Sequence, residues 1–338
     1  LFEKLDRLCK LQLIICPDSN IHTDESLMTG YFKELKRMYE LLSHGVSFER
    51  PETIQMHQIY EHAFNWISGS PEKPISVNVH DVVHGGINAW QSRFIISIDR
   101  NFQVSWIEDI RKSRNFVCAE MAEVFKKWQS EKGKPFRYFF DSECRGFISE
   151  LFSSYVDRLK RLHNISLGKA EMNIDDIFPT SSYRMIKAVH DTFERAGIQD
   201  EEIYNKTMEY LNSKYIKDIP FLKISAMFFA AIARKAAAGK KNPPGQGISN
   251  DISIISVILP YCDALFIDKE CHAYLKEVPL RDEIKYGTKI FSLSNKNEFF
   301  EYLDSIEKSA SEDHLFWVRQ VYGDNWGKPY TELYAEGS

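Results

Sequence analysis

The sequence predicts a mixed α/β protein in which a small, mostly parallel sheet is interrupted by a large helical insertion. Three observations support this fold class: short apolar runs alternate with helical patterns after residue 250, a further apolar run lies near the start of the chain, and helical periodicity dominates between them. Short apolar strands that alternate with helices are typical of a parallel sheet. We therefore expect the two ends of the chain to build one sheet domain around a helical lobe.

Residues 1–45 are predicted to begin the sheet domain. Residues 1–10 carry Leu and Phe at helical spacing, and residues 11–16 (LQLIIC) form an apolar run that Pro17 ends. This pattern is typical of a helix followed by a buried strand. Asp18 and Ser19 then supply turn and cap side chains for a helix over residues 25–42.

Residues 46–240 are predicted to form the helical insertion, and no fixed repeat period is visible in them. A weaker, strand-like stretch at residues 93–98 interrupts the helical pattern. The expected helices cover residues 52–67, 106–128, 146–162, 183–196, 202–215 and 224–238.

Residues 241–338 are predicted to complete the sheet domain and to end in a helical tail. The segment 239–249 (GKKNPPGQGIS) is the strongest break in the chain, because it is rich in Gly and Pro. Helices are expected over residues 251–259, 269–277 and 295–308, and strands over residues 264–267 (ALFI) and 289–293 (KIFSL).

Composition restricts the class of protein. The formal net charge of −5 means that nucleic-acid affinity would have to come from a local basic surface. No apolar run has the length of a membrane span. Six scattered cysteines without a CxxC pair are typical of reduced, packed thiols. We expect a soluble, cytoplasmic protein without membrane contact.

Acidic residues follow or precede the predicted strands. Glu25 comes one turn after the apolar run 11–16, Asp268 ends the strand 264–267, Asp263 begins it, and Asp251 opens the preceding helix. Ligands of open parallel sheets bind beyond the carboxyl ends of the strands. Converging carboxylates repel one another unless a cation holds them, and hard oxygen ligands suit Mg²⁺ or Mn²⁺. Such ions activate water and stabilise phosphoryl displacement.

Each of these acids also has a structural interpretation. Asp251 can be a helix cap, Asp263 a turn residue, and Glu25 a first-turn helix acid. A purely structural role is harder to assign to Asp268, because it lies between an apolar strand and Lys269. The prediction of a metal site therefore depends on the combination of acids.

Two segments resemble the PIN-like nuclease family. Asn250-Asp251-Ile252, followed by residues 261–270 (YCDALFIDKE), is similar to the C-terminal half of that family, and residues 17–26 are similar to the region that supplies its helix acid. The resemblance covers residues 1–30 and 245–310. It implies a three-layer PIN-like fold, metal ligands at Glu25, Asp251 and Asp268, auxiliary roles for Asp263 or Glu270, and endoribonuclease-like hydrolysis of single-stranded RNA rather than DNA.

The sequence departs from that family at two places. A PIN-like domain begins with a strand that ends in a metal-binding Asp, and that strand would precede Leu1. We expect that further residues, including this Asp, lie upstream. The helical insertion is also far larger than the compact fold requires, and it is a candidate surface for a second copy of the chain or another protein partner.

The basic residues that lead into Asp251 are the candidate nucleic-acid contacts: Arg234, Lys235, Lys240 and Lys241. Basic residues near a helix C-terminus are also routine partners of the helix dipole.

Two alternative functions remain open. The first is a non-catalytic binding or assembly protein that keeps the fold without a complete site. The second is a zinc hydrolase built on His80 and His84, whose spacing would place both on one face of a helix.

Overall fold

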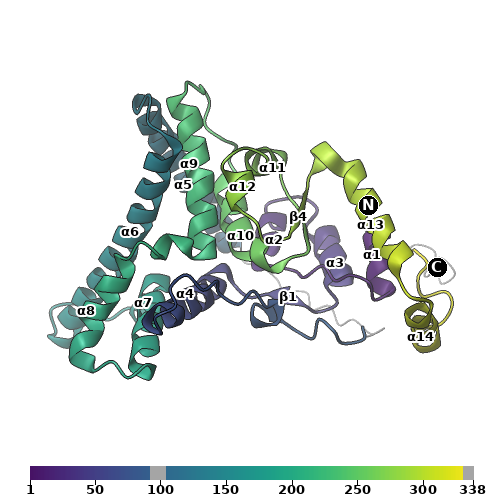
Figure 1. Cartoon of the computed structure of the whole chain (residues 1–338), viewed down its shortest axis with the longest axis horizontal. Coiled ribbons are helices and arrows are strands. Elements are labelled where there is room, and N and C mark those ends of the chain that lie inside the picture. The colour runs from purple at the N-terminus through teal and green to yellow at the C-terminus, as the bar shows by residue number, and fades with distance from the viewer. Residues whose placement is uncertain (92–103, 330–338) are drawn as a thin grey trace.

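The computed structural model describes residues 1–91 and 104–329. Most of the described residues are helical, and the strands are few and short. Figure 1 shows long helices of the middle of the chain on one side of the molecule and helices from both chain ends on the other. The mixed α/β class with a large helical part is confirmed in these residues. The strand-like stretch at residues 93–98 lies outside them.

The helices of the middle segment agree with the sequence pattern in number and order. α9 lies along α6 and is buried on nearly all sides, because its sequence (PFLKISAMFFAAIARKAA) is apolar around the whole helix. Pro220 stands in its first turn, where the missing N–H would have no partner anyway. The bounds are α4 (Pro51–Ile67), α5 (Val104–Ser130), α6 (Phe136–Ser166), α7 (Ser181–Arg195), α8 (Asp200–Leu211) and α9 (Pro220–Ala237).

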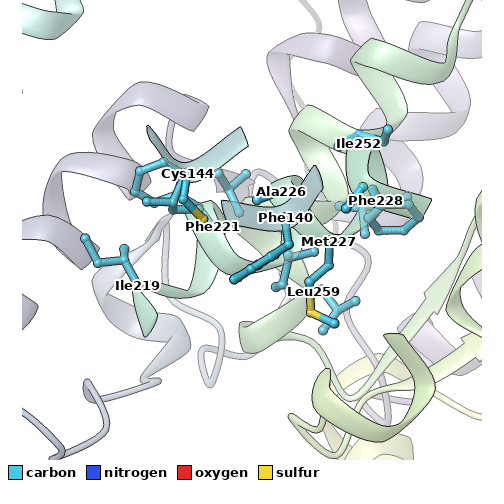
Figure 2. Close-up of a cluster of buried hydrophobic side chains, with 14 of the residues drawn as sticks. Phe140, Cys144, Ile219, Phe221, Ala226, Met227, Phe228, Ile252 and Leu259 are labelled. Atoms are coloured by element: carbon cyan, nitrogen blue, oxygen red, sulfur yellow. The ribbon is translucent and has the colours of Figure 1, made fainter. Parts of the chain in front are cut away.

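One hydrophobic core connects the helical middle to the C-terminal segment. Figure 2 shows side chains of α6 and α9, such as Phe140 and Met227, packed near Leu259 and near Ile252 of α10 (Ile248–Ile258). Phe228 is fully buried and meets the ring of Tyr274 on α11. The middle and C-terminal segments therefore share one core, whereas the boundaries at residues 45/46 and 240/241 remain predictions.

The C-terminal segment alternates strands and helices as the sequence predicts. β3 and β4 pair in parallel, with Leu265 opposite Ile290. The element bounds are α10 (Ile248–Ile258), β3 (Ala264–Phe266), α11 (Lys269–Leu275), α12 (Leu280–Glu283), β4 (Lys289–Phe291), α13 (Lys296–Ser309) and α14 (Glu312–Tyr322). A separate antiparallel pair is formed by β1 (Ser47–Phe48) and β2 (Val83–His84).

The predicted strand at residues 11–16 is wrong. After α1 (Phe2–Lys10) the chain turns through Gln12, whose φ is +58°, and the Leu13 N–H donates to Leu8 O. Leu13 and Ile14 pack against a second hydrophobic cluster that contains Phe291 of β4. The run is apolar because its side chains are partly buried against this cluster. In the described chain, the only ladder contact nearby is a bridge between Asp18 and Ser47.

The predicted helix over residues 25–42 is two helices. α2 (Asn20–Ser26) begins at Ser19, whose side chain accepts from the His22 N–H, and α3 (Phe32–Ser43) follows after a break that contains Gly30. A glycine disfavours helix continuation, because it loses more backbone entropy than other residues. The break makes Glu25 the penultimate residue of a short helix rather than the first-turn acid of a long one.

The two ends of the described chain lie together. α1 packs on α13, and Trp326 Nε1 donates to the carbonyl of Lys10 at 2.7 Å. Within residues 1–91 and 104–329, no helix has the length and apolar character needed to cross a membrane.

Candidate metal centre

Three elements carry the predicted acids into one region. Asp251 stands in the first turn of α10, Asp268 caps α11 directly after β3, and Glu25 lies near the end of α2. Figure 1 shows α2, α10 and α11 close together at the middle of the molecule. The loop before α10 and the strand before α11 therefore position two of these acids by local structure, and tertiary packing adds the third.

Ligand atoms of Asp251, Asp268 and Cys271 lie within 4.8 Å of one another. Asp268 Oδ1 also accepts the N–H of Glu270, which fixes this carboxylate at the start of α11. Residues three apart on a helix share a face, so the Cys271 thiol lies on the same side as the Asp268 carboxylate. Among the described residues this is the one group of three potential ligands at such short range.

The charges of four carboxylates act on one another here. Burial and, after it, the charges of Glu25, Asp268 and Glu270 together raise the pKa of Asp251 to about 6. Arg114 of α5 acts in the opposite direction and lowers it. The charge of Glu25 on α2 also acts on Asp251, but Glu25 is not part of the group within 4.8 Å, so the structure brings together two of the three acids that the sequence singled out.

Cys271 is the residue that sequence reasoning assigned only to the core. It is fully buried, as expected, but its sulfur also adjoins the two carboxylates. Burial and the charges of Asp251, Asp268 and Glu270 raise the pKa of the Cys271 thiol well above its usual range, so the thiol is protonated at neutral pH. The spacing Asp268-x-x-Cys271 at a helix start was the signal that could have identified it.

The Gly-rich loop before α10 forms one wall of the centre. The Gly245 N–H donates to Glu270 Oε2 at 3.1 Å, and Lys240 Nζ donates to Oε1 of the same carboxylate at 3.0 Å. A Cβ at Gly247 would lie 3.5 Å from Asp251 Oδ2. Glu270 therefore holds the loop against α11, and both of its oxygens are engaged.

α5 covers this loop from the other side. Cys118 Sγ lies 3.6 Å from the carbonyl oxygen of Gln246, to which it donates. Arg114 precedes Cys118 by one helical turn, so it lies on the same face of α5. Arg114 is half-buried and is the cation that acts on Asp251.

The structure does not bring Asp263 into the group. Its carbonyl accepts the N–H of Lys289 at the start of the parallel pair, at the opposite end of β3 from Asp268. Burial and, after it, the charge of Asp263 raise the pKa of Cys262 and of Tyr302. Its predicted role as a metal ligand therefore has no geometric support.

Three of the four basic residues predicted to contact nucleic acid form ion pairs within the chain. Lys235 Nζ lies 2.6 Å from Glu277 Oε1, and Arg234 lies 3.8 Å from the same carboxylate. Lys240 pairs with Glu270, whereas Lys241 is exposed. These ion pairs hold the end of α9 and the loop after it against the segment that contains α11.

His80 and His84 do not share a helical face. His80 lies in a single turn, η1 (Val79–Asp81), and His84 lies in β2, where its Nε2 is 2.8 Å from Glu49 Oε1. In the part of the chain that is described, neither belongs to a group of three potential metal ligands.

No family model, curated protein or solved structure matches this chain.

Proposed function

We propose that this protein is a metal-dependent nuclease that hydrolyses phosphodiester bonds, with RNA as its substrate. The observation that carries the proposal is the convergence of Asp251 and Asp268 within 4.8 Å, in a field to which Glu25 and Glu270 also contribute. Mutual repulsion of this kind is relieved when a cation binds. The preference for RNA rests on the resemblance to PIN-like nucleases alone.

The residues fit a hard divalent cation. Asp251 and Asp268 would hold Mg²⁺ or Mn²⁺, with Glu25 as the third proposed ligand, because carboxylate oxygens are the ligands that these ions prefer. The buried, protonated thiol of Cys271 suits a soft metal better, so we assign it a packing role. An ion held there would activate a water molecule and neutralise charge at the phosphate.

Other residues near the carboxylates would bind the phosphate and hold the loop before α10 in place. Arg114, whose charge lowers the pKa of Asp251, would bind phosphate oxygens, because its guanidinium can donate two parallel hydrogen bonds. Glu270 and Lys240 hold the loop 245–247 in place and so position Asp251 at the helix start.

A PIN-like arrangement is part of the proposal. It is supported by an acid in the first turn of α10, by Asp268 between β3 and α11, and by a parallel partner strand that leads into α13. The three-layer form and a fourth acid upstream of Leu1 remain predictions.

The decisive experiment is cleavage of labelled single-stranded RNA and DNA with Mn²⁺, Mg²⁺ or EDTA. We expect metal-dependent cleavage of RNA by the wild type and none by Asp251→Asn or Asp268→Asn, since each substitution removes ligand charge at nearly constant volume. Asp157→Asn, at an exposed site on α6, is the matched control. Circular dichroism would verify folding, and wild-type cleavage by both site variants would contradict the proposal.

A second candidate function is assembly through the helical segment. Large apolar side chains gather around the connection between α6 and α7, where Met172, Ile174, Ile177 and Phe178 are between 61% and 71% exposed. Exposed apolar patches of this kind mark interaction sites. Ultracentrifugation of the wild type and of Ile174→Ser with Phe178→Ser would test this function, and a monomer at all concentrations would count against self-assembly.

A further inference from the structure

A second candidate binding site lies beside α11, on residues that the metal centre does not use. A cavity of about 430 Å³ opens between α11, α12 and β4. Its size is within the range typical of small-molecule sites. His272, the neighbour of Cys271 in the sequence, contributes to its lining together with residues 284–288.

Three cationic side chains line this cavity: Lys276, Arg281 and Lys285. Arg281 is paired with Asp282, whose carboxylate accepts from Nε at 2.9 Å. Lys276 and Lys285 form no ion pair with any residue of the described ranges and are exposed. The cavity therefore presents two cations without a counterion within hydrogen-bond reach.

The rest of the cavity is apolar or aromatic. Leu259, Leu275, Ile284 and Ile290 supply aliphatic surface, and Tyr286 adds a ring. His272 is only 3% exposed, its Nδ1 is 3.1 Å from Ser292 Oγ, and its Nε2 has no partner among the residues described. A ligand that fits both parts has an anionic end and an apolar or planar body.

We propose that this cavity binds a phosphate monoester with a planar body, for which a nucleoside 5′-monophosphate is the model. Its phosphate carries nearly two negative charges at neutral pH, matching the two unpaired lysines. Its base can lie against the aliphatic wall and the Tyr286 ring. A carboxylate ligand would neutralise one lysine and leave the other uncompensated.

The test is isothermal titration calorimetry with adenosine 5′-monophosphate in EDTA. Loss of one charge-assisted contact is expected to weaken binding about tenfold in Lys276→Gln and in Lys285→Gln. Lys126→Gln, on an exposed face of α5, is the matched control and should bind as the wild type does. Both substituted lysines are exposed, so the variants should fold.

Two further ligands and two further variants make the outcome decisive. Adenosine and inorganic phosphate should each bind more weakly than the monophosphate, because each lacks one half of the contacts. Absence of monophosphate binding, or unchanged binding in the Lys276→Gln, Lys285→Gln double variant, would overturn the proposal. Asp268→Asn should retain full binding, which separates this site from the proposed nuclease centre.

Discussion

Replacing Asp251 by Asn should stabilise the metal-free protein at neutral pH. The folded protein holds the pKa of Asp251 at about 6, against 3.8 for an unperturbed Asp, because burial and neighbouring carboxylates disfavour the charged form. At about 1.4 kcal/mol per pH unit this gap corresponds to about 3 kcal/mol. Asp251 is only half-buried, so solvent screening reduces the expected gain to roughly 1–2 kcal/mol.

The sign of the pH dependence follows from linkage. Because the folded pKa is raised, the stability linked to protonation of Asp251 is fully present below 3.8 and is lost as the pH rises through about 6. The neutral Asn side chain has no such loss. Asp251→Asn should therefore match the wild type at about pH 4 and exceed it at about pH 8.

Urea denaturation in EDTA at both pH values measures the difference. Asp157→Asn, on exposed α6 surface, should show no comparable gain. Addition of Mn²⁺ should stabilise the wild type more than Asp251→Asn, since the cation relieves the repulsion that the substitution has removed. A variant that is less stable than the wild type at about pH 8 without metal would refute the electrostatic reasoning.

Three further predictions concern the surroundings of the centre. Phe228→Ala should lower the free energy of unfolding by about 3–5 kcal/mol in urea titrations, because the fully buried ring packs against Tyr274; a loss under about 1 kcal/mol would contradict the packing. Cys271→Ala should retain Mg²⁺-dependent cleavage and lose modest stability, and abolished cleavage in folded protein would make the sulfur a ligand. Arg114→Gln should raise the pKa of Asp251 further in a carboxyl NMR titration, whereas no change would place Arg114 outside the centre.

The sequence by itself determined most helices and the alternation of strands and helices after residue 250. These patterns are local. The apolar stripe of each helix and the short apolar runs 264–267 and 289–293 indicate which side chains of a regular helix or strand are buried. Asp251 and Asp268 were identifiable for the same reason, since a helix start and a strand end are positions along the chain. Glu25 lies on another helix, so the effect of its charge on Asp251 depends on how the chain packs.

Tertiary structure alone decided which apolar runs became strands and which charged side chains lie close together. Residues 11–16 are apolar like β3, yet they pack on a second cluster between α1 and α13 and do not pair with a strand. A partly buried segment without strand pairing has the same apolar sequence pattern as a buried strand. Lys240 pairs with Glu270, and Cys271 lies beside two carboxylates, because the fold brings separate segments together. The fold also keeps Asp263 apart from this group. Hydrophobic burial is non-directional, so composition shows that a residue is buried, whereas its neighbours depend on how the whole chain packs.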